Sequence, residues 1–149
     1  MSETGKTTTT SALWEQLIKA PSIEQFFCLN EAELGLPPFS EFISSLCKMR
    51  GEVPERVIKR AGIERSFGHS IFRGDRKPSR DTVLQLAFGF GADIELSQSL
   101  LRHAGCSLLY PKVPRDVAIS YCLLHGKDFL KAQDVLMELG LPLIGGTVK

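Results

Sequence analysis

The chain has 149 residues, which can hold one domain or one domain plus an extension, and its 43% hydrophobic content is enough for a packed core. No apolar run approaches the roughly 20 residues of a membrane-spanning helix, and the polar start MSETGKTTTT does not resemble a secretion signal, so a cytoplasmic protein without membrane attachment is expected. The net charge of +1 is uninformative until it is divided along the chain.

The first segment, residues 1–10, is mostly polar and is expected to be a disordered tail. Residues 11–36 are predicted to form an N-terminal helical arm. Its first helix, over residues 11–19, places its apolar side chains on one face and is closed by Pro21.

A second helix of the arm is predicted to begin at Ser22, where the letters SIEQ match a capping box that ends at Gln25. Trp14, Phe26 and Phe27 would form a sticky patch if all three were exposed. The arm is therefore expected to pack on the body of the protein or on a second subunit.

Two prolines, Pro37 and Pro38, separate the arm from a predicted amphipathic helix over residues 40–50. The next predicted helix, over residues 53–61, has apolar residues at the spacing of one helical face. Pro54 suits the first turn of that helix, because a backbone N–H at this position would have no partner within the helix.

Gly62 is expected to end this helix in the left-handed conformation, and Ile63 to fill the angle between two helices. A following helix over residues 65–73 would turn Phe67 and Ile71 toward a core and leave its polar side chains outward. This layout is typical of the recognition helix in a helix-turn-helix motif.

The ordered string of helix, glycine, apolar residue, second helix, Gly74, basic loop and Pro78 resembles the helix-turn-helix of the phage-repressor family of DNA-binding proteins, also called Cro/C1 or XRE. With the flanking helices, the resemblance spans residues 39–105. It implies an all-α, lambda-repressor-like five-helix DNA-binding domain, which we place at residues 37–106.

The resemblance also implies which side chains would meet DNA. Arg65, at the start of the recognition helix, is the main candidate for reading a base, because a guanidinium can bond guanine O6 and N7 together, worth about 1–3 kcal/mol of discrimination. The other base-reading candidates are Ser66, Ser70, Glu64 and His69. Phosphate contacts, which fix register without reading sequence, are expected from Arg56, Arg73, Arg76 and Lys77.

Four positions depart from the family pattern. Pro54 stands where the family commonly has a glutamine that positions the DNA backbone, so that contact is missing. Ile58 and Gly68 stand where the family has a small and an apolar residue, which predicts that bulk has moved from one helix to the other at their crossing. Phe72 stands where a glutamate is frequent, which predicts an apolar contact in place of a buried ion pair.

Two further helices, over residues 81–89 and 93–104, would complete the five. Beyond them the chain repeats itself, because a shift of 35 positions aligns eight identical residues without a gap. The aligned residues are Arg80, Asp81, Gly91, Asp93, Gln98, Leu101, Gly105 and Leu108 with Arg115, Asp116, Gly126, Asp128, Gln133, Leu136, Gly140 and Leu143. Residues 107–149 are therefore predicted to form a C-terminal helical hairpin extension that enlarges the core or binds a partner or second subunit.

The charge is concentrated around the proposed motif. Between residues 48 and 81, ten Lys and Arg residues stand against five Asp and Glu residues, a balance of +5, so the rest of the chain carries −4. A basic segment in an otherwise mildly acidic protein is expected where a nucleic-acid duplex docks, although a solvated helix face gives a similar pattern.

No catalytic residue, metal site or cofactor is predicted. Phosphate-binding loops and hydrolase or metalloprotease motifs are lacking, and the three histidines are scattered. The four cysteines, Cys28, Cys47, Cys106 and Cys122, lie far apart, which is typical of reduced, mostly buried thiols.

These patterns predict a sequence-specific transcriptional regulator that binds double-stranded DNA. A homodimer is expected, because one short recognition helix reads only a few base pairs. The alternative is a helical protein-interaction adaptor that keeps the fold without DNA readout and binds a protein partner through the C-terminal hairpin or Phe67.

Overall fold

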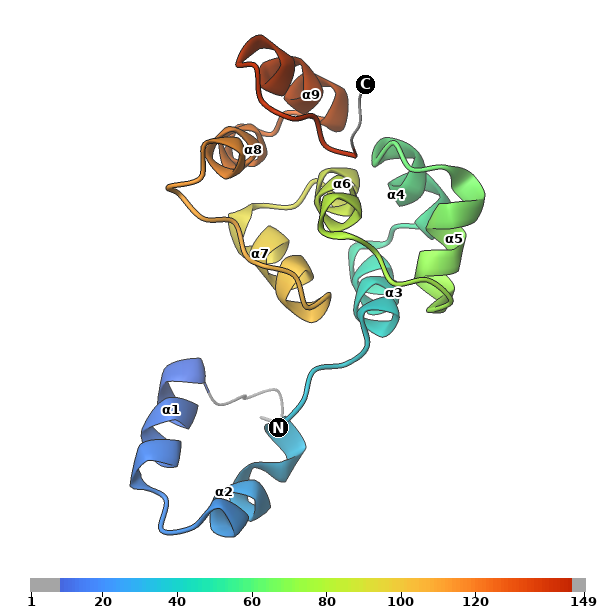
Figure 1. Cartoon of the computed structure of the whole chain (residues 1–149). Coiled ribbons are helices and arrows are strands. Elements are labelled where there is room, and N and C mark those ends of the chain that lie inside the picture. Colours follow the sequence, from blue (N-terminus) through green and yellow to red (C-terminus); the bar gives the residue numbers. More distant parts are fainter. Residues whose placement is uncertain (1–8, 146–149) are drawn as a thin grey trace. The chain divides into compact units, whose positions relative to one another are not determined.

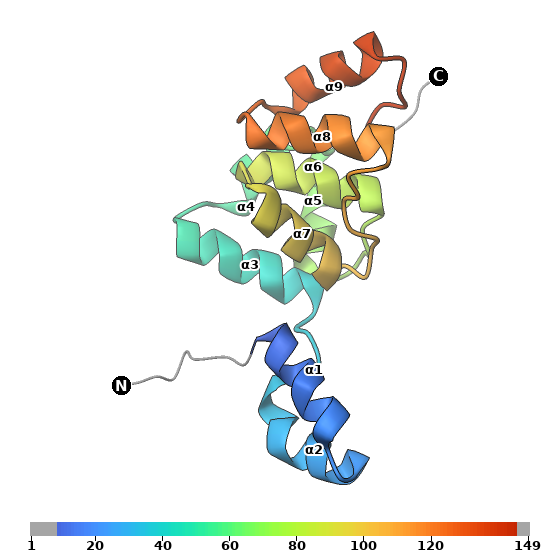
Figure 2. The ribbon, with the colours of Figure 1, turned by 90° about the vertical axis from the view of Figure 1, so that its left-hand side faces the viewer.

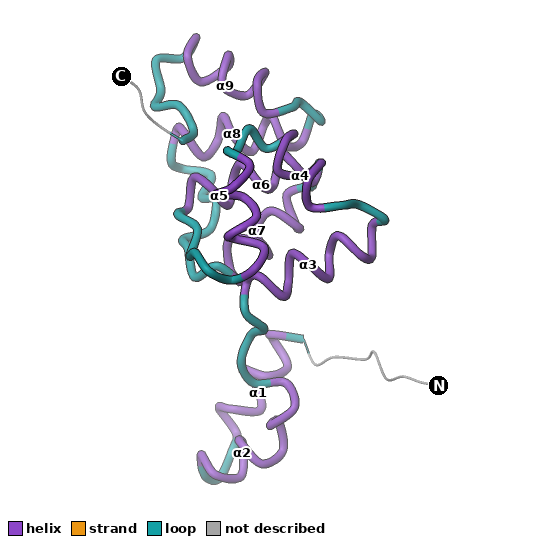
Figure 3. Tube along the Cα trace, turned by 90° about the vertical axis from the view of Figure 1, so that its right-hand side faces the viewer, coloured by secondary structure: helices purple, strands orange, loops and turns teal. Residues whose placement is uncertain are grey.

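The computed structural model describes residues 9–145, and every regular element in that range is a helix (Figure 3). The chain divides into two compact units, Met1–Leu36 and Pro37–Lys149. The helices are α1 Thr10–Lys19, α2 Ile23–Asn30, the 3-10 turn η2 Glu31–Glu33, α3 Phe39–Arg50, α4 Pro54–Arg60, α5 Arg65–Arg73, α6 Arg80–Phe90, α7 Ile94–His103, α8 Pro114–Leu124 and α9 Phe129–Glu138. None of them combines the length and apolarity that a membrane crossing requires.

The first unit is a pair of short capped helices. The Thr9 hydroxyl accepts a hydrogen bond from the backbone N–H of Ala12 at 3.1 Å, and the predicted cap Ser22 accepts one from Gln25 at 3.1 Å. Phe26 is buried, whereas the side chains of Trp14 and Phe27 are exposed. The expected packing of the arm on the body of the protein or on a second subunit stays a prediction. The tail expected over residues 1–10 lies outside the described residues, except for Thr9 and Thr10.

The second unit is built around α6. Eight residues of this helix are buried, and it packs against α4, α7 and α9. In Figure 1, α6 lies between α5 on one side and α8 on the other, and Figure 2 shows the same arrangement turned by 90°. Each of the five helices predicted between residues 40 and 104 is present, with ends within two residues of the predicted ones.

A glycine allows α4 to approach α6 closely. A Cβ atom at Gly89 would lie only 2.5 Å from the carbonyl oxygen of Val57, so no other residue fits without a backbone shift. Arg60, at the end of α4, donates from Nε to the carbonyl of Gly89 at 2.9 Å. The position of α4 on α6 is therefore fixed by backbone contact as well as by side chains.

The two repeated hairpins, α6–α7 and α8–α9, exchange arginines. Arg80, at the start of α6, donates to Asp116 at 2.9 and 3.2 Å, and Arg115, at the start of α8, donates to Asp81 at 3.0 Å twice. Exchanging the two copies turns one ion pair into the other. The rotation that carries the first hairpin onto the second therefore also carries the second back onto the first. Such a rotation is two-fold, so the hairpins are related by an approximate two-fold axis and not by a repeated translation.

The loops that follow the hairpins repeat the same contacts. Arg80 also donates to the carbonyls of Ser107 and Leu108, and Arg115 to those of Pro142 and Leu143, each 35 positions further on. Gln98 bonds to the backbone N–H and carbonyl of Leu109, and Gln133 bonds to those of Ile144 in the same way. Every polar atom of this network finds a partner, which is the condition for buried charges to be tolerated.

Asp81 receives a further hydrogen bond from the backbone N–H of Gly145 at 2.9 Å. Burial raises the pKa of Asp81, but the hydrogen bonds from Arg115 and Gly145 outweigh it and hold the pKa below its ordinary value. Because the folded pKa is depressed, the stability that Asp81 contributes is present at neutral pH and is lost as the pH falls through that lowered pKa.

Replacement of Asp116 should destabilise the second unit strongly. Asp116 is 4% exposed, and Asp116→Ala would leave the guanidinium of Arg80 without its carboxylate partner and the N–H of Tyr110 without its acceptor. We expect a loss of about 3 kcal/mol in the free energy of unfolding, measured by urea denaturation. The control Asp134→Ala removes an exposed carboxylate from α9 and should change it by less than about 0.5 kcal/mol. Equal effects of the two substitutions would contradict the structural role of the exchange.

Candidate nucleic-acid interface

Helices α4 and α5 are joined by a tight turn (Figure 3), and their ends lie within one residue of the predicted ones. Pro54 occupies the first turn of α4, and Gly62 has a φ of +71°, in the left-handed region that glycine favours. Ile63 is half-buried and packs against the core from this turn. The turn therefore sets the angle at which α5 leaves α4.

The crossing of α4 and α5 depends on Gly68 and Ile58. A Cβ atom at Gly68 would lie 2.6 Å from Cγ2 of Ile58, and the Ile58 side chain is buried. The predicted contact between the larger residue on α4 and the glycine on α5 is present. Phe72, one turn after Gly68, is buried in the core, so an aromatic ring occupies that position without an ion pair.

Glu64 caps the start of α5. Its two carboxylate oxygens accept hydrogen bonds from the backbone N–H groups of Phe67 at 2.8 Å and Ser66 at 3.1 Å. These bonds, first that from Phe67, lower the pKa of Glu64. Its carboxylate lies at the positive end of the helix dipole, and its position beside the bases stays a prediction.

Arg65 and His69 both bind Glu55, which lies in the first turn of α4. Nε of Arg65 lies 2.7 Å from one Glu55 oxygen, and Nε2 of His69 lies 2.8 Å from the other. The hydrogen bonds from Arg65 and then His69 lower the pKa of Glu55, and Glu55 in turn raises the pKa of Arg65. Glu55 was not among the predicted site residues, because the sequence gives no angle between the two helices.

The two serines of α5 differ in their surroundings. The Ser70 hydroxyl donates to the carbonyl of Phe67 at 2.6 Å and is half-buried. Ser66, in the first turn, is exposed. Of the two predicted hydroxyl readers, Ser66 has the more accessible side chain.

The predicted phosphate-binding cations are all exposed. Arg73 pairs with Asp75 at 2.9 Å, and both side chains are more than half exposed. Arg76 lies over the ring of Phe67, 5.7 Å from its centroid. Arg56 and Lys77 form no ion pair with any residue between 9 and 145.

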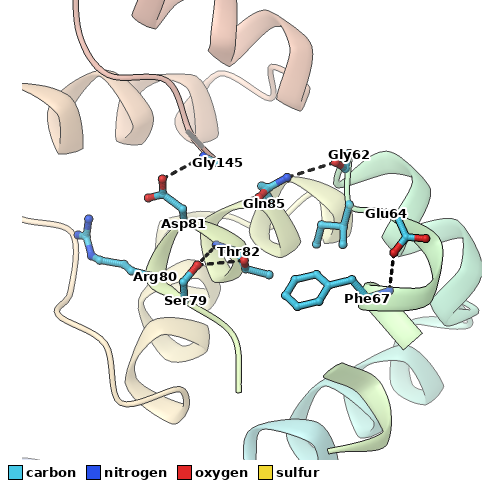
Figure 4. A pocket seen from close by; sticks show the side chains of 10 residues that line it. Gly62, Glu64, Phe67, Ser79, Arg80, Asp81, Thr82, Gln85 and Gly145 are labelled. Atoms are coloured by element: carbon cyan, nitrogen blue, oxygen red, sulfur yellow. Dashed lines mark hydrogen bonds between the residues drawn. The ribbon is translucent and has the colours of Figure 1, made fainter. Parts of the chain in front are cut away.

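A hollow of about 610 Å³ lies beside the start of α5 (Figure 4). One wall carries the half-buried ring of Phe67, which points toward Thr82 at the start of α6. Gln85 donates to the carbonyls of Ala61 and Gly62 at the rim and ties the turn to α6. Phe67 is thus partly covered and not freely presented to a partner.

The cysteines are all free, and the expectation that they are mostly buried holds for only part of the set. Cys47 and Cys122 are buried, and burial raises the pKa of both thiols. Cys106 is half-buried, whereas Cys28 is exposed, which corrects the prediction for that residue. Cys28 lies on α2, and its small unit buries few side chains.

Comparison of the chain with protein-family models, curated proteins and solved structures finds no significant match. The structure brings Arg65, Ser66 and His69 together on the outer face of α5, with Arg56 on the adjoining helix and Arg76 and Lys77 on the loop that follows. It places Glu55 among them.

The Gly68–Ile58 crossing can be tested by a double-mutant cycle. Alanine is a better helix former than glycine by about 1 kcal/mol, yet Gly68→Ala should lower the free energy of unfolding by about 1–3 kcal/mol, because its Cβ meets Ile58. In that background, Ile58→Ala should cost clearly less than it does alone, and both changes are measured by urea denaturation. Additive effects would show that the two residues do not constrain each other.

Proposed function

We propose that the second unit binds double-stranded DNA by placing α5 in the major groove, and that the protein is a sequence-specific transcriptional regulator with a lambda-repressor-like domain over α3–α7. One observation carries the proposal. The outer face of α5 carries exposed polar side chains, and Arg56 on α4 with Arg76 and Lys77 on the loop after α5 are cations for which the described residues provide no carboxylate partner. Such an arrangement suits a helix that contacts base edges in a DNA groove, with phosphates on both sides of it.

The cations divide into two roles. Arg56, Arg76 and Lys77 supply the net positive charge that attracts a duplex, and counterion release makes their contribution depend steeply on salt. Arg73 is balanced by Asp75 at an exposed surface, where an ion pair is weak and can be exchanged for a phosphate. The four side chains together set the register of α5 on the DNA.

Arg65 is the residue proposed to read a base. Glu55 accepts from its Nε, so both terminal nitrogens of the guanidinium remain available for guanine O6 and N7. Glu55 then acts as a buttress that orients Arg65 without consuming the donors that read the base. Because the pKa of Glu55 is lowered, this buttress stays anionic throughout the neutral pH range.

A homodimer completes the proposal. One helix of nine residues reads only a few base pairs, whereas two copies related by a two-fold axis read a palindrome. Two half-sites multiply the discrimination that one helix can supply.

DNA affinity should fall steeply with salt, and Arg56→Ala with Lys77→Ala should reduce that dependence. Each phosphate contact adds about 0.9 to the slope of log affinity against log salt, so we expect the slope to fall by about 2. Fluorescence anisotropy with a labelled duplex, between about 50 and about 200 mM salt, measures it. Lys112→Ala with Lys131→Ala, two exposed lysines outside the interface, should leave the slope unchanged. Absence of binding at low salt would refute the proposal.

Arg65→Ala should flatten sequence preference more than it weakens binding. A selection from random duplexes defines the preferred site, and affinity for that site is then compared with affinity for a scrambled one. We expect the ratio to fall by about 10-fold or more, with a smaller loss on the scrambled duplex. Glu55→Gln retains Arg65 but removes its charged buttress, and should reduce the ratio while strengthening binding to both duplexes. An unchanged ratio in Arg65→Ala would remove Arg65 as a base reader.

One observation favours the adaptor alternative. The α8–α9 hairpin exposes apolar side chains, among them Tyr121 and Leu124 on α8 and Leu130 on α9. A protein that binds no duplex at low salt but binds a partner protein through this hairpin would be such an adaptor.

A further inference from the structure

The approximate two-fold axis allows each outer face of the repeated hairpins to be compared with its counterpart. In the first copy, the outer face of α6 includes Thr82, Gln85, Leu86 and Gly89. It is covered by α4 and the Gly62 turn, and Phe67 of α5 lines the hollow beside Thr82. Thr82 and Leu86 are buried, and Gln85 bonds to the turn. This face of the fold is therefore one that receives another helical element.

Among the described residues of the second unit, none covers the corresponding face of the second copy. A shift of 35 positions carries Thr82, Leu86 and Gly89 to Val117, Tyr121 and Leu124, which are 45%, 51% and 67% exposed. Together with Ile94 and Leu109, these residues line a groove of about 420 Å³. The second copy thus exposes a more apolar version of a face that the first copy buries.

The exposed surface of α8 also lacks charge. Its two charged residues, the half-buried Arg115 and the buried Asp116, are both engaged in the exchange with α6, and its exposed side chains are Pro114, Val117, Tyr121 and Leu124. Val117, Tyr121 and Leu124 follow the spacing of four and three residues that forms one stripe along a helix. An uncharged apolar stripe with an aromatic residue has the composition of the centre of a protein interface.

We propose that a second copy of this chain covers the groove, through an isologous contact in which α8 packs against α8 of the other copy. Rotation about a two-fold axis places each stripe on the same stripe, so no like charges are opposed. The segment from residue 48 to 81, by contrast, carries a balance of +5, and two copies meeting there would repel each other. The contact also leaves α5 free, because α5 and α8 lie on opposite sides of α6 (Figures 1 and 2).

This inference rests on the homodimer of the proposed function and assigns its interface. It makes α8 the partner-binding helix of the C-terminal hairpin and leaves α9 outside the contact. Tyr121 and Leu124 are the residues expected to contribute most, since they are the largest exposed apolar side chains of the stripe.

The test is the mass of the full-length chain in solution without DNA, measured by sedimentation equilibrium. At about 50 µM the protein should have twice its chain mass of 16.5 kDa. Tyr121→Asp with Leu124→Asp should raise the dimer dissociation constant by at least about 100-fold and give the monomer mass. Leu130→Asp with Met137→Asp changes two exposed apolar residues on α9, and this variant should remain dimeric. Helical content by circular dichroism confirms that each variant is folded.

Self-cross-linking tests the symmetry of the contact. In a Cys28→Ser background, Tyr121→Cys should form a disulfide-linked dimer on mild oxidation, and Leu130→Cys should not. A wild-type protein that is monomeric at every concentration, or a dimer that survives the α8 substitutions, would overturn the proposal. A dimer that is lost with those substitutions but forms no cross-link at position 121 would mean that another part of the second chain occupies the groove, which also overturns it.

The failure of this interface and the failure of the proposed function are distinguishable. A dimer that depends on α8 but binds no duplex at low salt leaves the interface standing and removes DNA binding. A monomer that binds duplex DNA with steep salt dependence removes the interface and leaves DNA binding standing.

Discussion

Each hairpin of the second unit supplies an arginine to the aspartate of the other, and this exchange holds α6 at the centre of the fold. Both guanidiniums make paired bonds to a carboxylate and further bonds to loop carbonyls, a geometry that the single ammonium of lysine cannot reproduce. With α6 fixed, Gly89 admits α4 against its backbone, and the Gly62 turn then directs α5 outward. The orientation of the candidate interface thus depends on charges outside it, two of which, Arg115 and Asp116, are far from it in sequence.

Three carboxylates lie among the cations of that interface. Glu64 holds the backbone at the start of α5, Glu55 holds Arg65 and His69, and Asp75 holds Arg73. These carboxylates weaken the attraction of the interface to a polyanion, but they fix the direction of the side chains that they bind. Attraction and selection are therefore carried by different residues in the proposed function.

The limits of the helices could be predicted because prolines, capping residues and glycines act within a few residues of themselves. Ser22 and Gly62 are examples whose roles the structure confirms. The bond of Arg65 to Glu55 could not be predicted, because it depends on the angle between two helices. The hydrophobic periodicity of the sequence does not give that angle. The 35-residue repeat indicated two hairpins, but the same repeat fits either a translation or a rotation, and the reciprocal ion pairs distinguish them.

The single position at which the two outer faces differ most is Gly89, whose counterpart is Leu124. The absence of a side chain at Gly89 lets the backbone of α4 come within van der Waals reach of α6. A leucine at the same place holds any incoming helix at the ordinary interaxial spacing of about 8–10 Å. The second hairpin therefore cannot accept another pair like α4 and α5, and its bulk at this point restricts it to neighbours that meet it side chain to side chain.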